Sequence, residues 1–90
     1  MSLHVAAYDI ADNSRRRQVA KFLSAYGYRI QESVFEVWID LDDLDTFRFE
    51  LGILLDPADC FDVFPVDSRA RKRRFRWQKP PHAWNPVRVL

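Results

Sequence analysis

Hydrophobic and polar residues follow strand-like and then helix-like spacing along the first third of the chain. Residues 3–10 (LHVAAYDI) form a short apolar run that is typical of a central β-strand. Residues 12–14 (DNS) then supply N-cap side chains, and Gly27 is expected to end the helix as its C′ residue. Between these signals, apolar residues recur at helical spacing: Val19, Phe22, Leu23 and Tyr26.

A second apolar stretch, residues 28–39 (YRIQESVFEVWI), is rich in β-forming residues. Its periodicity fits one strand or two, and the polar triplet at residues 31–33 favours a break into two. After that triplet, Phe35, Val37 and Ile39 alternate onto one face, and the residues between them point to the other.

The next residues repeat the helix and strand signals. Asp42 or Asp43 is expected to cap a second helix, and Pro57 is expected to end it. Residues 60–66 (CFDVFPV) then predict a final strand, in which Pro65 marks a sheet edge or a strand end. The buried stripe of this second helix is expected to comprise Leu44, Phe47, Leu51 and Leu54.

This order of elements predicts an α+β fold of the ferredoxin-like type, with the pattern βαββαβ. Such a fold has a four-stranded antiparallel sheet with two helices on one of its faces. The other face needs a cover, which a second copy of the chain or the chain's own tail would provide.

The charge is divided unevenly along the chain. Residues 1–66 carry six Lys or Arg and twelve Asp or Glu, for a net charge of −6, whereas residues 67–90 carry eight and one, for +7. Together with the strand and helix pattern, this predicts a ferredoxin-like core over residues 1–66 and a basic C-terminal tail over residues 67–90.

Basic and aromatic residues alternate in this tail, and the pattern favours nucleic-acid binding through phosphate neutralisation and base stacking. The alternatives are a solubilising tail, or a tail that pairs with the acidic body of another protomer. Its last residues, 87–90 (VRVL), are also able to add a short strand to a sheet edge. The expected nucleic-acid contacts in the tail are Arg71, Lys72, Arg73, Arg74 and Arg76, with Phe75 and Trp77 between them.

Several classes of site are excluded or unsupported by the residues. The single Cys60 excludes an internal disulfide, and no cluster of Cys and His predicts a zinc site. The sequence shows no nucleophile triad and no Gly-rich phosphate loop. Because it also lacks a signal-peptide pattern and any long apolar run, we expect a cytoplasmic protein without membrane attachment.

The stretch YDIADNSRRR, residues 8–17, places one carboxylate, Asp9, close to three consecutive arginines, Arg15, Arg16 and Arg17. Cations at a helix N-terminus are unfavourable by a few tenths of a kcal/mol up to about 1 kcal/mol. The arginines are therefore expected to form a solvated face, to pair with Asp9 and Asp12, or to bind phosphate.

Asp9 itself has two interpretations. It is either a loop residue satisfied by backbone N–H groups, or a ligand for a hard cation such as Mg²⁺ or Mn²⁺. One Asp makes a poor metal site, but a two-fold dimer presents an interface Asp twice.

The motifs from Tyr8 to Glu36 resemble the CRISPR-associated protein 2 family. The resemblance rests on YDI, a short polar turn, an Arg-rich helix start, and YGYRIQESVFE. In element order it extends to about Val66. It implies a ferredoxin-like homodimer in which C-terminal strands often cross to the other protomer.

The resemblance also implies a site and an activity. Asp9 corresponds to the first-strand aspartate that is the proposed ligand of Mg²⁺ or Mn²⁺ at the dimer interface. Members are regarded as metal-dependent endonucleases on single-stranded RNA or double-stranded DNA, and they serve as the adaptor of an integrase complex with CRISPR-associated protein 1. Positions associated with activity or with shaping the site correspond to Tyr8, Arg16, Arg29 and Phe35.

Two main functional hypotheses follow. In the first, the chain is a dimeric adaptor of CRISPR adaptation that binds duplex DNA and hydrolyses phosphodiesters at metal held by Asp9. Arg16 and Arg29 then neutralise the phosphate, and Tyr8 and Phe35 position the strand. The three arginines at residues 15–17 are all expected to bind the nucleic-acid backbone. In the second, it is a structural DNA-binding scaffold in which Asp9 only shapes the interface. A related ferredoxin-like toxin ribonuclease is a third alternative.

Overall fold

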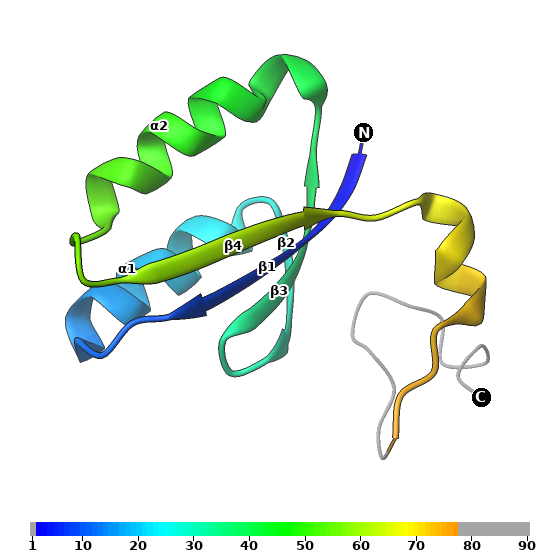
Figure 1. The fold of residues 1–90 in the computed structure, drawn as a ribbon, viewed down its shortest axis with the longest axis horizontal. Coiled ribbons are helices and arrows are strands. Elements are labelled where there is room, and N and C mark those ends of the chain that lie inside the picture. The colour runs from blue at the N-terminus through cyan, green and yellow to red at the C-terminus, as the bar shows by residue number, and fades with distance from the viewer. Residues whose placement is uncertain (1, 78–90) are drawn as a thin grey trace.

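The computed structural model describes residues 2–77 and shows one antiparallel sheet with two α-helices (Figure 1). The strand order in the sheet is β2-β3-β1-β4. In chain order, the elements are β1 (Ser2–Asp9), α1 (Asn13–Ser24), β2 (Gly27–Gln31), β3 (Val34–Ile39), a 3-10 helix η1 (Leu41–Asp43), α2 (Leu44–Leu54), β4 (Cys60–Pro65) and a second 3-10 helix η2 (Ser68–Arg73).

The predicted ferredoxin-like order and its four-stranded antiparallel sheet are confirmed. β1 is a central strand, flanked by β3 and β4. The break in the second apolar stretch falls at Glu32 and Ser33, so β2 and β3 form a hairpin. β4 lies at a sheet edge and ends at Pro65, as expected for a residue without a backbone N–H donor.

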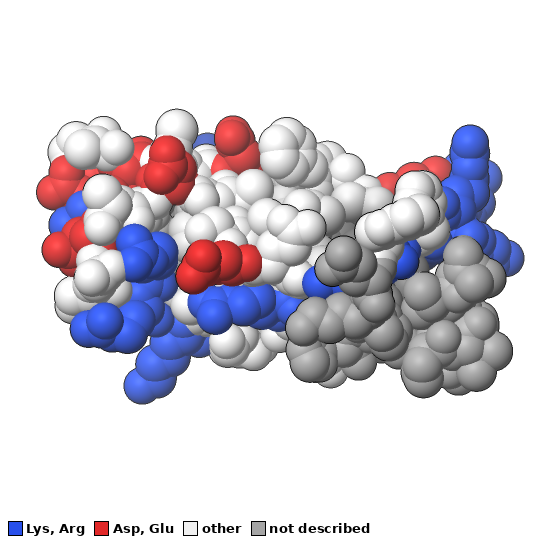
Figure 2. Space-filling model, turned by 90° about the horizontal axis from the view of Figure 1, so that it is seen from below, with Lys and Arg blue, Asp and Glu red and all other residues white. Residues whose placement is uncertain are grey.

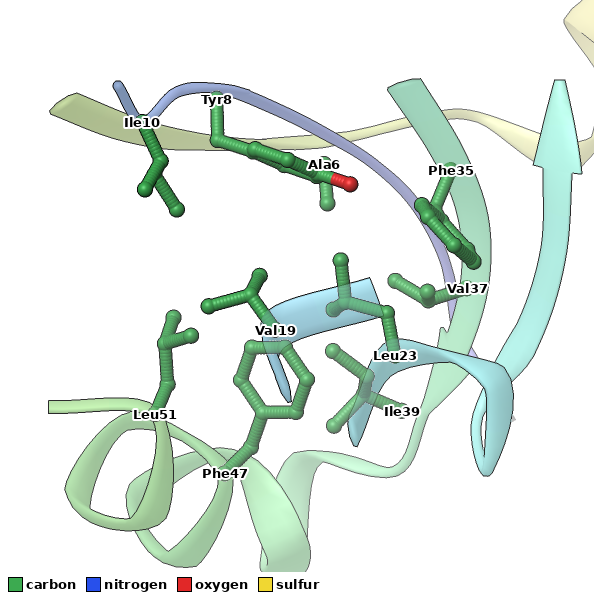
Figure 3. Packing of buried hydrophobic residues seen from close by; sticks show 10 residues of the cluster. All are labelled: Ala6, Tyr8, Ile10, Val19, Leu23, Phe35, Val37, Ile39, Phe47 and Leu51. Atoms are coloured by element: carbon green, nitrogen blue, oxygen red, sulfur yellow. The ribbon is translucent and has the colours of Figure 1, made fainter. Parts of the chain in front are cut away.

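The hydrophobic core lies between one face of the sheet and the two helices. Figure 3 shows side chains of α1 and α2 pointing toward those of β1 and β3. The alternation predicted for the third strand is confirmed, because Phe35, Val37 and Ile39 all lie on this face and are at most 2% exposed. The helices contribute Val19 and Leu23 from α1, and Phe47 and Leu51 from α2.

The predicted role of Gly27 is wrong. α1 ends at Ser24 with Ala25 as its C-cap, and Gly27 is the first residue of β2, where it faces Val37. A Cβ atom at Gly27 would lie 1.9 Å from the backbone oxygen of Glu36. The absence of a side chain is therefore needed for close approach of two strands, and not for a helix end.

The start of α2 also differs from the expectation in one detail. Asp43 occupies the N-cap position, as predicted, but its side chain makes no capping hydrogen bond. A 3-10 turn over Leu41–Asp43 leads directly into α2. The chain therefore enters α2 through a continuous helical segment, and the carboxylate is not required to satisfy the first N–H groups.

The second face of the sheet is partly covered by the first residues of the basic tail. Glu36 of β3 points to this face, and its carboxylate accepts a hydrogen bond of 3.1 Å from Arg74 and lies 3.9 Å from Arg71. The Arg71 guanidinium also lies over the Trp38 ring, 5.0 Å from its centre. Of the two covers expected for this face, the chain's own tail is thus observed over part of it.

The last strand of the tail and the absence of a membrane span were also predicted from the sequence. The predicted strand at residues 87–90 lies outside the described residues, as does all of the tail beyond Trp77. Within residues 2–77, no helix is long and apolar enough to cross a membrane.

Candidate metal and nucleic-acid site

Asp9 is the last residue of the central strand β1, where it pairs with Cys60 of β4. Because Tyr8 points into the helix-covered core, Asp9 points to the opposite face of the sheet, the open face, which neither α-helix covers and which the tail covers only in part. Its side chain is exposed, and within residues 2–77 no hydrogen bond or ion pair is recorded for its carboxylate. The interpretation of Asp9 as a loop residue held by backbone N–H groups is therefore wrong.

A second carboxylate lies on the same face. Asp62 pairs with Ala7, which places it diagonally across the β1–β4 ladder from Asp9. Diagonal neighbours in an antiparallel pair are roughly 7–8 Å apart. Both side chains are exposed, so this end of the open face has negative charge available to solvent.

The carboxylate oxygens of Asp9 and Asp62 are the type of donor that a hard divalent cation prefers, but two carboxylates do not make a complete site. An exposed carboxylate without a protein partner is the type of ligand that Mg²⁺ uses together with waters and phosphate. Among the described residues, however, no group of three or more His, Cys, Asp or Glu is placed to hold a metal ion. A site at Asp9 therefore requires further ligands from water, from substrate or from a second protomer.

Tyr8 and Phe35 lie inside the core, on the other side of the sheet from Asp9. They are 7% and 2% exposed, and their rings stack with centres 6.4 Å apart. The guanidinium of Arg29 lies over the outer end of this stack, 5.3 Å from the centre of the Phe35 ring. The structure thus groups Tyr8, Arg29 and Phe35 together but separates them from Asp9, so direct contact of Tyr8 or Phe35 with a nucleic-acid strand is not supported.

Arg15 lies in the first turn of α1 and pairs with a carboxylate that is distant in sequence. Its Nε and Nη2 atoms donate to Asp59 at 2.9 and 3.0 Å, and the Asp59 side chain is only 2% exposed. The hydrogen bonds between them raise the pKa of Arg15 and lower the pKa of Asp59. The predicted side-chain pairing with Asp9 or Asp12 is wrong, since the Asp12 carboxylate accepts instead from the backbone N–H of Arg15 as the helix N-cap.

Arg16 binds the backbone of the connection that follows Asp9. Its Nη1 atom donates to the carbonyl oxygens of Ile10 at 2.8 Å and Ala11 at 3.3 Å, and its Nη2 atom donates to Asn13. Two of the three arginines are therefore held by oxygen atoms of the protein. These contacts offset the unfavourable position of the cations at the helix N-terminus.

Arg17 and Lys21 form the outward-facing basic pair of α1. Both are exposed, they lie four residues apart on the helix, and within residues 2–77 neither has a recorded hydrogen bond or ion pair. Of the three arginines predicted to bind nucleic acid, Arg17 is therefore the one whose side chain is available to phosphate in this structure.

The arginines of the tail divide into inward and outward sets. Arg71 and Arg74 contact Glu36, as described above, and Arg76 donates to the carbonyl oxygen of Ile30 at 2.8 Å. Burial lowers the pKa of Arg74. The sequence pattern predicts nucleic-acid contacts for all three residues, whereas in the structure they attach the tail to the sheet.

The outward set is exposed at the end of the molecule that carries η2. Lys72 and Arg73 are exposed, and so are the rings of Phe75 and Trp77, at 68% and 78%. Figure 2 shows basic side chains at this end of the molecule and again near the opposite end. Exposed positive charge thus lies at both ends of the long axis.

Sequence reasoning missed Asp59 and Glu36. Each is a carboxylate that binds an arginine of a distant segment: Asp59 binds Arg15, 44 residues away, and Glu36 binds Arg74, 38 residues away. No local spacing indicates such a pairing. The only available signal was that Glu36 falls on an alternating position of a strand whose other face is fully apolar.

The comparisons with known proteins agree on one family. The model of the family described as "CRISPR associated protein Cas2" matches residues 1–74. A relative from Nitrosomonas europaea, named CRISPR-associated endoribonuclease Cas2 2, is 40% identical over 73 residues, which are 80% of this chain and 65% of that protein. The chain thus spans slightly less than two thirds of that relative's length.

Two further matches cover the whole chain. CRISPR-associated endoribonuclease Cas2 3 of Synechocystis is 32% identical over an alignment of 91 positions that covers 100% of this chain and 99% of that protein. A chain in the structure of a partial Cas6-RT-Cas1–Cas2 complex matches with a TM-score of 0.73 at 19% identity, covering 100% of each chain. At that identity, the second match shows similarity of fold alone.

Proposed function

The chain belongs to the Cas2 family of CRISPR-associated proteins, and from this premise we propose that it is a homodimeric adaptor of CRISPR adaptation. In this role it binds duplex DNA together with the integrase, CRISPR-associated protein 1. The exposed basic side chains at both ends of the long axis support this proposal, because a duplex backbone is bound mainly through phosphate contacts. A chain of the same fold is part of a partial Cas6-RT-Cas1–Cas2 complex.

The proposal includes metal-dependent hydrolysis of phosphodiesters in RNA or DNA. The observation that carries it is the Asp9 carboxylate, exposed at the end of the central strand and without a recorded protein partner within residues 2–77. In a two-fold dimer formed through the open face, two Asp9 side chains would face each other and complete a shared site. When bound there, Mg²⁺ or Mn²⁺ would polarise the phosphate and activate water.

The roles of the surrounding residues in this proposal follow from their contacts. Asp9 holds the cation, and Arg17 with Lys21 neutralises the backbone of the bound strand. Arg16 orders the connection after Asp9 through the carbonyl oxygens of Ile10 and Ala11, and does not neutralise phosphate. Phe35, beneath Arg29, maintains the shape of the core behind the site.

The test is an assay of the purified chain with single-stranded RNA and duplex DNA, in the presence of Mg²⁺, Mn²⁺ or EDTA. Cleavage is expected only with metal and is expected to be lost in Asp9→Asn. Asp45→Asn, which changes an exposed carboxylate on α2, is the matched control and should cleave normally. Cleavage that persists in Asp9→Asn would remove Asp9 from the catalytic role.

A second candidate function, a DNA-binding scaffold without catalysis, is favoured by one observation. Within residues 2–77 the donor set for a metal is incomplete, as described above. A scaffold would bind duplex DNA with equal affinity in metal and in EDTA, would cleave neither substrate, and would be unaffected by Asp9→Asn. Co-elution with CRISPR-associated protein 1 in size-exclusion chromatography tests the adaptor role, which both candidates share.

A further inference from the structure

Asp59 is a buried acceptor at the start of β4. It lies in the turn between α2 and β4, and its carboxylate accepts three hydrogen bonds. Two of them come from Arg15, through Nε at 2.9 Å and Nη2 at 3.0 Å, and the third comes from the backbone N–H of Asp56 at 2.9 Å. The bidentate geometry fixes the first turn of α1 against this turn in one orientation.

The residue after Asp59 is the ladder partner of Asp9. Cys60 begins β4 and pairs with Asp9 at the end of β1. On the other side, the backbone immediately after Asp9 is held by Arg16, which donates to the carbonyl oxygens of Ile10 and Ala11. The first turn of α1 thus binds the chain on both sides of Asp9, across the sheet through Arg15 and along the strand through Arg16.

The Asp9 side chain has no recorded partner of its own within residues 2–77. Its position in space therefore depends on the backbone of the strand end, and that backbone is held by the two neighbouring contacts. Groups that hydrogen-bond directly to a metal ligand typically change metal affinity by about 10–100-fold when they are removed, and groups that act through the backbone are expected to have an effect at the lower end of this range.

We infer that Asp59 and Arg15 are positioning residues, whose ion pair holds the end of β1 so that Asp9 is presented for a divalent cation. This inference rests on the proposed function, in which Asp9 is the metal ligand. It assigns no contact with substrate to Arg15, although the sequence pattern predicted that Arg15 binds nucleic acid.

The test uses Mn²⁺ alone as the probe and the ¹⁵N-labelled full chain. Paramagnetic broadening of backbone amide signals reports both where Mn²⁺ binds and its apparent Kd. In the wild type we expect broadening centred on Asp9 and Cys60. In Asp59→Asn and Arg15→Gln the apparent Kd should rise about tenfold, and Arg15→Lys should not restore it because an ammonium cannot form the bidentate contact.

Asp67 and Arg69 provide a matched control. Their side chains form the same kind of contact, 2.9 Å from Nη2 of Arg69 to Oδ2 of Asp67, and the Asp67 carboxylate likewise accepts a backbone N–H. This pair lies at the start of η2, on a different element from Asp9. Asp67→Asn should leave the apparent Kd for Mn²⁺ unchanged, so that a general effect of losing an Asp–Arg contact is excluded.

The outcomes separate the inference from the proposed function. Wild-type affinity for Mn²⁺ in Asp59→Asn, even with a lowered melting temperature, would overturn the positioning role. If Mn²⁺ fails to broaden Asp9 in the wild type, the metal assignment fails, and amide hydrogen exchange decides the inference instead. Exchange at residues 9–11 and 60 should then be at least about tenfold faster in Asp59→Asn relative to the β2–β3 hairpin, and an unchanged ratio would overturn it.

Discussion

The Glu36 carboxylate and the Arg74 guanidinium lie 3.1 Å apart, although 38 residues separate them in the sequence. The Glu36 side chain is 6% exposed and that of Arg74 is 22% exposed, so both charges are largely removed from water. This contact joins the acidic body to the basic tail within one chain. The negative charge of residues 1–66 and the positive charge of the tail therefore neutralise each other in part through a direct contact.

Removing one partner of this contact should destabilise the fold. Glu36→Gln leaves Arg74 and Arg71 beside a neutral side chain in a poorly hydrated position, and we expect a loss of about 1–3 kcal/mol in the free energy of unfolding. Urea titration followed by tryptophan fluorescence measures this change. The exposed-residue variant Asp45→Asn, which removes only a first-turn charge of α2, is the comparison, and wild-type stability in Glu36→Gln would show that the contact contributes nothing.

The outward basic residues of the tail should act on DNA binding and not on stability. The double variant Lys72→Gln/Arg73→Gln should weaken duplex binding and reduce the slope of log Kd against log salt by about 2, because each phosphate contact contributes roughly 0.9. Fluorescence anisotropy at several salt concentrations gives this slope. Arg17→Gln, in α1 at the other end of the molecule (Figure 1), should reduce it by about 1. An unchanged slope in both variants would exclude these surfaces as DNA contacts.

The fold was predictable because its signals are local. The alternation of Phe35, Val37 and Ile39 and the helical spacing of Val19 and Leu23 follow directly from burial on one face. These patterns fix the type and order of the elements. They carry no information on how closely two strands approach each other. For this reason the sequence places Gly27 at a helix end, whereas its actual role is in the β2–β3 contact.

The candidate site was only partly predictable, because it depends on contacts between distant segments. Asp9 was identifiable from its place after an apolar run and from the resemblance of its motif. The partners of the arginines were not, since a run such as RRR gives no indication of which side chain turns inward. Arg15 turns toward Asp59, Arg16 toward backbone carbonyl oxygens, and Arg17 toward solvent.

The two glycines provide a matched pair of substitutions. Gly27→Ala places a Cβ atom 1.9 Å from a backbone oxygen that cannot move independently of β3, and we expect a loss of about 1–3 kcal/mol in the free energy of unfolding. Gly52→Ala lies in α2, where the added Cβ has no atom within 4 Å apart from its chain neighbours and the backbone of its own helix, and it should stabilise the chain by about 0.5–1 kcal/mol. Thermal unfolding of both variants measures the difference. A Gly27→Ala variant as stable as Gly52→Ala would mean that the β2–β3 approach is looser than described.

Stability should fall at acid pH, and Asp59 should account for part of that fall. Arg15 lowers the pKa of Asp59 in the folded state, below the usual value of about 3.9 that it has in the unfolded chain. Between the two pKa values the unfolded state binds more protons. The stabilisation is therefore fully present above about pH 4 and is lost as the pH falls through the lowered pKa of the folded state. Urea midpoints measured from pH 7 down to pH 2 should decrease below about pH 4 in the wild type.

Asp59→Asn should have a lower urea midpoint at pH 7 and a smaller decrease of that midpoint on acidification, because it has no carboxylate to protonate at position 59. Asp67 titrates in the same direction, since Arg69 lowers its pKa. Comparing Asp59→Asn with Asp67→Asn therefore separates the buried contact from the exposed one. The decrease in urea midpoint on acidification should be reduced more in Asp59→Asn than in Asp67→Asn, because the Asp59 side chain is 2% exposed and that of Asp67 is 54% exposed. Equal pH profiles in the wild type and Asp59→Asn would show that the Arg15 contact does not contribute to stability in solution.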